Sequence, residues 1–215
     1  RFGAYIDLMP VRSRGAFQFV AAKRESDGRA VVLALAGPRA DRSLVRDAFR
    51  EAARVTALLD HPRIARVEAC GDADGVPYLS FDCPAVADGL DVVRVIADSE
   101  EKIPYGAADA FIAGLRETLV AAHAVTDPLR GGPVCLGRFS AGNVLFDADG
   151  SWKLVGFGRN LAIEKDSGAV DGEPAFCAAP ELASGAAASP SGDYVALILF
   201  SRTVLPYVDM SGAVG

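Results

Sequence analysis

One stretch of the sequence decides the fold, and it reads Gly142-Asn143-Val144-Leu145-Phe146-Asp147-Ala148-Asp149-Gly150-Ser151-Trp152-Lys153-Leu154-Val155-Gly156-Phe157-Gly158. Two short apolar runs, Val144–Phe146 and Trp152–Val155, flank a turn-forming segment that ends in Asp-Gly. Such a pattern predicts a β-hairpin. Asn143 stands directly before this hairpin and is a candidate functional position, whereas Phe157, which follows it between two glycines, is expected to be a core aromatic.

The chain before this hairpin begins with a part rich in strands. Apolar runs bounded by turn residues predict strands, and apolar residues at every third or fourth position predict a helix. The expected strands are Tyr5–Val11, Ala16–Lys23, Val31–Leu35, Ile64–Cys70 and Val76–Phe81, and the expected helix is Asp41–Leu59. We therefore expect a β-rich N-lobe with one helix over residues 1–82.

Helices dominate after this first lobe. The expected helices are Leu90–Asp98, Tyr105–Val125 and Asp193–Leu205, and one further short strand is expected at Cys135–Leu136. The whole chain is therefore predicted to have an α+β fold of two lobes, residues 1–82 and 83–215.

Charge and cysteine content exclude several classes of function. The net charge is −6 and no Lys/Arg cluster is dense enough for a nucleic-acid surface, so we expect no nucleic-acid partner. The four cysteines are widely spaced without a C-x-x-C pair, which argues against a zinc site and a disulfide framework. No apolar run approaches the roughly 18 residues of a membrane helix, so no membrane contact is expected within this segment.

The order of these elements and the motifs along them resemble a Hanks-type bacterial Ser/Thr protein kinase, from about Tyr5 to about Pro206. The matching motifs are His61-Pro62-Arg63-Ile64 (HPNI after the αC helix), Gly142–Phe146 (the end of the catalytic loop), Lys153–Gly158 (KL-(I/V)-DFG), Ala179-Pro180-Glu181 (APE) and Ser191-Gly192-Asp193 with its helix. The resemblance implies a protein-kinase-like bilobal fold, with a β-rich N-lobe that carries the αC helix and a helical C-lobe.

Three positions that the family uses for phosphoryl transfer carry other residues here. Ala34 stands where the resemblance implies the lysine that pairs with the phosphates, Arg138 where it implies the aspartate base, and Gly156 where it implies the aspartate that holds Mg²⁺. Arginine does not deprotonate, so Arg138 cannot act as a base. The resemblance therefore implies a degenerate member of the family, a pseudokinase.

The nucleotide cleft implied by the resemblance is expected to be vestigial. Only one glycine of the glycine-rich loop remains, and Gln18 places a polar side chain where phosphate would meet backbone. Phe81 matches the gatekeeper and would narrow the back of the adenine pocket. The residues expected to line this vestigial cleft are Gly15, Gln18, Ala34, Phe81, Cys83 and Asn143.

No metal and no cofactor are expected. Asn143 is a neutral ligand, whereas Mg²⁺ prefers one or two carboxylates. Asp147 and Asp149 fit a plain hairpin turn better than a substitute metal site. Glu51 lies one residue from the αC position of the expected glutamate, Ala52, and is predicted to be solvated or to act as a displaced partner.

The C-lobe is expected to be truncated after the helix at about 193–205. In the family, the APE glutamate pairs with an arginine from later helices, so Glu181 should be exposed here or be covered by another segment. We expect an apolar surface where those helices would pack, and with it a protein partner or self-association.

These observations lead to one expected function and one alternative. The chain is expected not to be an enzyme, but a catalytically inactive pseudokinase that acts as a scaffold or regulatory module of a larger bacterial signalling protein. We expect it in the cytoplasm, either free or as the cytosolic domain of a membrane-anchored protein. The alternative is an atypical nucleotide-binding enzyme of the kinase fold, in which Arg138 or Lys23 replaces the lost cations.

Overall fold

The computed structural model describes residues 1–12, 17–37, 40–99, 101–137, 139–158 and 179–213. The chain divides into two compact units: Arg1–Asp88 with Val144–Glu173, and Gly89–Asn143 with Pro174–Gly215. This division differs from the predicted one at residues 82/83 because the hairpin after Asn143 pairs with a strand of the first unit. Among the described residues, no helix is both long and apolar enough to cross a membrane.

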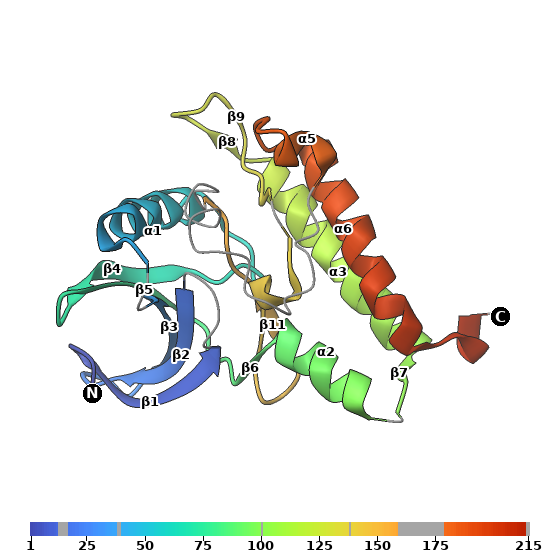
Figure 1. Cartoon of the computed structure of the whole chain (residues 1–215), viewed down its shortest axis with the longest axis horizontal. Helices are drawn as coiled ribbons and strands as arrows, with labels where there is room; N and C mark the ends of the chain where they lie inside the picture. The colour runs from blue at the N-terminus through green and yellow to red at the C-terminus, as the bar shows by residue number, and fades with distance from the viewer. Residues whose placement is uncertain (13–16, 38–39, 100, 138, 159–178, 214–215) are drawn as a thin grey trace. The chain divides into compact units, whose positions relative to one another are not determined.

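The first unit is built on an antiparallel sheet with the strand order β1-β2-β3-β5-β4 (Figure 1). Its strands are β1 (Tyr5–Arg12), β2 (Phe17–Arg24), β3 (Ala30–Ala36), β4 (Val67–Ala73) and β5 (Val76–Phe81). In this register Ala34 of β3 lies between Phe19 of β2 and Leu79 of β5. The central strand therefore places Ala34 in the core, where it is 3% exposed.

Helix α1 (Arg42–Thr56) packs on this sheet. Its N-terminus is capped by Asp41, whose carboxylate accepts hydrogen bonds from the backbone N–H groups of Ser43 and Leu44. Its buried face consists of Val45, Ala48, Phe49, Ala52, Val55 and Thr56. The helix ends before Leu59, the predicted end, although Leu59 is itself buried.

The predicted β-hairpin is confirmed and belongs to the first unit. Strand β10 (Val144–Phe146) pairs with β11 (Trp152–Leu154), and β10 also pairs with β6 (Ala87–Asp88). In the turn, the backbone N–H of Gly150 donates to the carbonyl of Asp147, and that of Ser151 to the carboxylate of Asp149. The two aspartates thus hold the turn, as their sequence pattern predicts.

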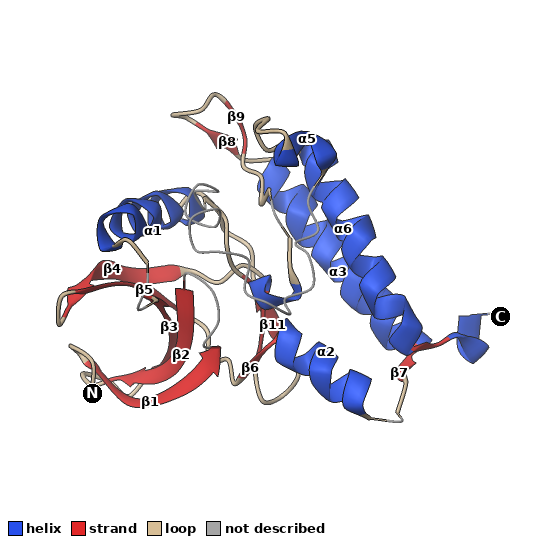
Figure 2. Ribbon diagram, in the orientation of Figure 1, coloured by secondary structure: helices blue, strands red, loops and turns tan. Residues whose placement is uncertain are grey.

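The second unit is mainly helical, as Figure 2 shows. Its helices are α2 (Gly89–Asp98), α3 (Tyr105–His123), α5 (Pro180–Ala183) and α6 (Pro190–Val204), with 3₁₀ turns at Ala141–Asn143, Leu205–Tyr207 and Met210–Ala213. Its short strands are β7 (Ile103–Pro104) with β12 (Val208–Asp209), and β8 (Thr126–Asp127) with β9 (Gly132–Pro133). Helices α3 and α6 pack against each other (Figure 1), and the Phe200 ring of α6 makes edge contacts with Phe111 and Phe139.

The strand predicted at Cys135–Leu136 is wrong. No strand forms there, because the backbone N–H of Leu136 donates to the side chain of Asp193 and not to a neighbouring strand. The predicted strand Ile64–Cys70 starts later, at Val67. The backbone of Ile64 instead makes an isolated bridge to Leu154 of the hairpin.

Candidate functional site

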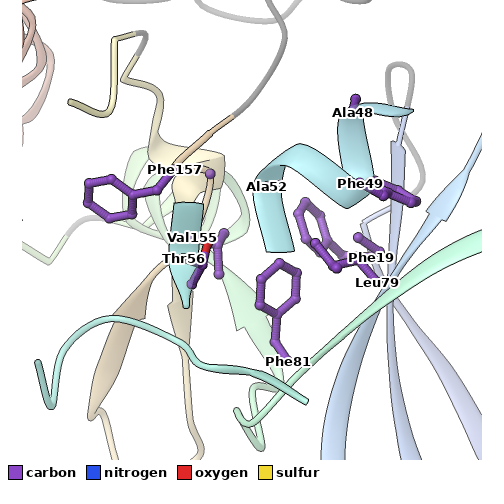
Figure 3. A pocket seen from close by; sticks show the side chains of 11 residues that line it. Phe19, Ala48, Phe49, Ala52, Thr56, Leu79, Phe81, Val155 and Phe157 are labelled. Carbon is purple, nitrogen blue, oxygen red and sulfur yellow. The ribbon is translucent and has the colours of Figure 1, made fainter. Parts of the chain in front are cut away.

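A small apolar pocket lies in the first unit between β3 and α1. Figure 3 shows the rings of Phe19, Phe49 and Phe81 gathered at this pocket. It is lined by Phe19, Ala34, Ala48, Phe49, Ala52, Thr56, Leu79, Phe81, Val155, Gly156 and Phe157. Its volume is about 30 Å³, which is room for about one water molecule. Only Thr56 brings a polar side chain to this lining, so the pocket is apolar and nearly filled.

The residues that line this pocket carry no charge, and the neighbouring Glu51 is paired with another residue. Ala34 brings no cation and Ala52 no carboxylate to the lining. Glu51, predicted to be solvated or to act as a displaced partner, binds Arg54 one turn along α1, with N···O distances of 2.7 and 2.8 Å. The lysine–glutamate pair implied by the family resemblance is therefore replaced by two alanines, and the nearby glutamate is engaged on its own helix.

Lys23, proposed as a substitute cation, lies elsewhere. Its Nζ is 3.0 Å from the Asp7 carboxylate, and its side chain is 54% exposed. In the β2–β3 register Lys23 faces Ala30, whereas Phe19 faces Ala34. Four residues of strand span about 13 Å. Lys23 therefore does not reach the position that the family lysine would occupy, and this part of the alternative is wrong.

The backbone at Gly156 has a conformation that suits glycine. Gly156 has φ +111°, a conformation that residues with a Cβ rarely adopt. Gly158 has φ +74°, and a Cβ on it would lie 2.8 Å from Cβ of Val55. Phe157 between them is 1% exposed, which fits its predicted role as a core aromatic. This segment is therefore packed closely on α1 through glycine-only geometry.

In the connector that follows β5, residues 82–84, the backbone N–H groups already donate hydrogen bonds. The N–H of Asp82 donates to the carbonyl of Arg66, and the N–H of Cys83 to the carbonyl of Phe81. Pro84 has no N–H to offer. Lys153 Nζ donates to the carbonyl of Asp82 at 2.8 Å. A ligand at this connector would therefore meet carbonyl oxygens, not the N–H groups of residues 82–84.

Cys83, predicted as a cleft residue, lies within this connector. It is 2% exposed, and burial raises the pKa of its thiol to about 11. It is therefore a neutral, buried side chain at neutral pH, which is consistent with packing and not with nucleophilic chemistry.

In the second unit, Asn143 braces the loop that precedes β10. It is 1% exposed, and its Oδ1 accepts hydrogen bonds from the backbone N–H of Ser140 at 2.8 Å and from its hydroxyl at 3.1 Å. An asparagine that satisfies local backbone donors fixes the loop conformation. Arg138 in the same loop and Gly15 of the glycine-rich loop lie outside the described residues.

A buried carboxylate holds the start of the same loop. Asp193 is 2% exposed, and its oxygens accept hydrogen bonds from the backbone N–H groups of Leu136 at 2.8 Å and Gly137 at 2.6 Å. The Nε2 atom of His123 lies 2.9 Å from the same carboxylate. Asp193 is in the first turn of α6, where the helix macrodipole favours a negative charge, and His123 is in the last turn of α3.

This network was not predicted as part of the site. In the sequence, Asp193 stands at the start of one predicted helix and His123 lies within another, Tyr105–Val125. A buried carboxylate in the first turn of a helix gives no local signal of its distant partners, because the Leu136 amide lies far away in the sequence. Glu181, in contrast, is exposed, which is one of the two outcomes that the sequence allowed.

The predicted cleft residues therefore divide among several places. Ala34, Phe81 and Gly156 meet around the apolar pocket of the first unit. Gln18 lies on β2 opposite Leu35 and is partly buried. The remaining described residues of the predicted set are Cys83 in the connector of the first unit and Asn143 in the second unit.

Solved protein-kinase structures are similar to this chain, whereas no family model matches it. The crystal structure of the Mycobacterium tuberculosis PknI kinase domain is 21% identical, with a TM-score of 0.68, and the match covers 100% of this chain and 77% of that one. A double mutant of the same domain is 22% identical, with a TM-score of 0.69 and coverage of 96% and 77%. The α+β, protein-kinase-like bilobal fold is confirmed, and with it the resemblance to Hanks-type bacterial Ser/Thr kinases at the level of the fold.

The expectation that the chain is not an enzyme is contradicted by this comparison. The similar structures are kinase domains, that is, domains of enzymes. Ala34, Arg138 and Gly156 remain facts of the sequence. A functional interpretation therefore has to combine an enzyme fold with a set of residues that differs from the usual one.

Proposed function

Starting from the kinase fold, we propose that this chain is an atypical nucleotide-binding enzyme of a bacterial signalling system. It handles its nucleotide with residues other than the usual lysine and two aspartates. The observation that carries the proposal is the retained frame of the catalytic loop, with Asp193 and Asn143 holding its backbone on both sides of the position of Arg138.

The free-energy cost of burying Asp193 supports the proposal that the loop it holds has a function. Burying a carboxylate is unfavourable by several kcal/mol unless its partners compensate. Asp193 receives three such partners, and two of them are backbone N–H groups directly before Arg138. Asp193 therefore fixes the backbone directly before Arg138, which is the residue that the proposal uses.

The proposed chemistry does not use a metal in the usual position. Gly156 offers no carboxylate, and its backbone conformation disfavours one. In the proposal, the guanidinium of Arg138 supplies the positive charge that Mg²⁺ and lysine supply in other kinase-fold enzymes. An arginine cannot be the base, so the acceptor would have to be an already nucleophilic group or water.

A transfer assay tests this proposal. Tag-free protein is incubated with ATP labelled at either the α- or the γ-phosphate, in Mg²⁺, in Mn²⁺ and in EDTA. We expect label to be transferred to the protein or released, with little change in EDTA. Arg138→Ala should abolish the signal because it removes the proposed phosphate-binding cation.

Lys23→Ala is the matched control, since it removes a cation that is held on the surface by Asp7. This variant should keep the wild-type rate. The proposal is overturned if neither labelled nucleotide reacts under any of the three conditions, or if Arg138→Ala reacts as well as the wild type.

A second candidate function is that of a protein-binding regulatory module. A hollow of about 250 Å³ lies between α1 and β4, lined by Arg46, Phe49, Arg50, Ala53, Cys70, Gly71 and Asp72. Arg46 is held by Asp72 at 2.7 Å, whereas Arg50 makes a long contact of 3.4 Å with Asp47 and is 68% exposed. The Phe49 ring and the Arg50 guanidinium together favour a partner segment with an apolar and an acidic side chain.

Exposed apolar residues of α6 favour the same second candidate. Ile198 is 60% exposed, and Val195 and Leu199 are each 37% exposed. Partner binding or self-association through this helix, and a cytoplasmic location, belong to this proposal.

A further inference from the structure

Three side chains with metal-binding atoms converge in the second unit. They are His123 at the end of α3, Cys135 in the segment after β9, and Asp193 in the first turn of α6. One ligand atom of each lies within 4.8 Å of those of the other two. Among the described residues, this is the group of His, Cys, Asp and Glu side chains that could hold a metal ion.

The donor set is typical of one class of metal. Zinc binds thiolate sulfur, imidazole nitrogen and carboxylate oxygen, whereas Mg²⁺ and Ca²⁺ take oxygen ligands. Three protein ligands with a fourth position for water form a common zinc arrangement. The group is also shielded from solvent, since the side chains of His123 and Asp193 are 9% and 1% exposed.

The existing hydrogen bonds leave room for a metal ion. Asp193 uses one oxygen for the Gly137 amide, and the other for the Leu136 amide and the His123 ring. A carboxylate has about four lone-pair positions. A metal ion would replace the hydrogen bond between His123 and Asp193 and the thiol proton of Cys135, which now donates to the Pro133 carbonyl at 3.6 Å, while both backbone bonds to the loop remain.

The distances require a small adjustment. Zinc–ligand distances of about 2.0–2.3 Å place tetrahedral ligands roughly 3.3–3.6 Å apart. The present separation of His123 Nε2 and Asp193 Oδ2 is 2.9 Å, so these two would move apart slightly while the Cys135 sulfur moves inward. Rotation of the Cys135 side chain, which is only partly buried, allows this movement.

We propose that His123, Cys135 and Asp193 form a binding site for Zn²⁺ or a chemically similar divalent cation. The ion would tie the end of α3, the segment after β9 and the start of α6 together. Because Asp193 also holds the amides of Leu136 and Gly137, occupancy would stabilise the start of the loop that carries Arg138. Metal binding at this site can be tested whether or not the proposed nucleotide chemistry is correct.

Cobalt titration of metal-free, tag-free protein tests the site. Co²⁺ bound to a thiolate gives charge-transfer absorption that oxygen and nitrogen ligands do not give. We expect one equivalent of Co²⁺ to produce this band, and Zn²⁺ to displace it. Cys135→Ser should remove the band and weaken Zn²⁺ binding by more than the roughly 10–100-fold that loss of a merely orienting partner costs.

Two matched control variants show whether the cobalt band comes from this site or from another cysteine or histidine. Cys70→Ser removes an exposed cysteine outside the group, and His61→Asn removes the other of the two histidines in the chain. Both should keep the band. Thermal unfolding in EDTA shows whether each variant is folded. Absence of a thiolate band in the wild type, or an equal band in folded Cys135→Ser, would refute the proposal.

Discussion

Ala34→Lys is expected to destabilise the first unit by about 3–5 kcal/mol and not to restore a kinase site. The variant places an ammonium group in a pocket of about 30 Å³ whose lining offers no carboxylate. Glu51, the nearest candidate by sequence, is bound to Arg54. The buried charge would therefore lack a partner, and the long side chain would not fit.

Urea unfolding followed by circular dichroism measures this effect. Ala34→Met is the matched control, because it adds a long side chain without charge and should cost only the roughly 1–3 kcal/mol of overpacking. Adding Ala52→Glu to Ala34→Lys should recover part of the loss, since both residues line the same pocket. Equal stability of the lysine and methionine variants would contradict an apolar, charge-excluding pocket.

Asp193→Ala is expected to destabilise the second unit by about 3–5 kcal/mol, measured in EDTA so that metal binding plays no part. The change leaves the buried amides of Leu136 and Gly137 without their acceptor and removes the partner of His123. The segment before Arg138 should loosen as a consequence. Hydrogen exchange should therefore accelerate at the amides of Leu136 and Gly137.

Asp209→Ala provides the comparison for this variant. Asp209 is exposed and accepts local hydrogen bonds from Ser211, from its side chain and from its backbone N–H at 2.9 Å. Its loss should cost within about 0.5–1 kcal/mol and leave exchange in the loop unchanged. If the two aspartate variants unfold at the same urea concentration, Asp193 is not the anchor of the loop.

Much of the fold follows from local patterns in the sequence. The turn at Asp149-Gly150 predicts the β10–β11 hairpin, and the spacing of Ala48, Ala52 and Val55 predicts the buried face of α1. Local patterns could not reveal that the strand expected at Cys135–Leu136 does not form. Its backbone donors are taken by Asp193, and a long-range side-chain acceptor leaves no mark on the local apolar pattern.

Less of the candidate site than of the fold could be predicted from the sequence. The substitutions at Ala34 and Gly156 are visible in the sequence, but their meaning depends on conformation. The φ of Gly156, +111°, and the closure of the pocket around Ala34 become visible only in the folded chain. The convergence of His123, Cys135 and Asp193 likewise requires three separate elements to meet, and cysteine spacing alone argued against a zinc site.

The central claim is that this kinase fold binds nucleotide through Arg138 without the usual metal. Calorimetric titration of the protein with ATP, in Mg²⁺ and in EDTA, tests it most directly. We predict binding of similar affinity in both buffers, and its loss in Arg138→Ala but not in Lys23→Ala. Binding that appears only with Mg²⁺, or that persists unchanged in Arg138→Ala, would contradict the account.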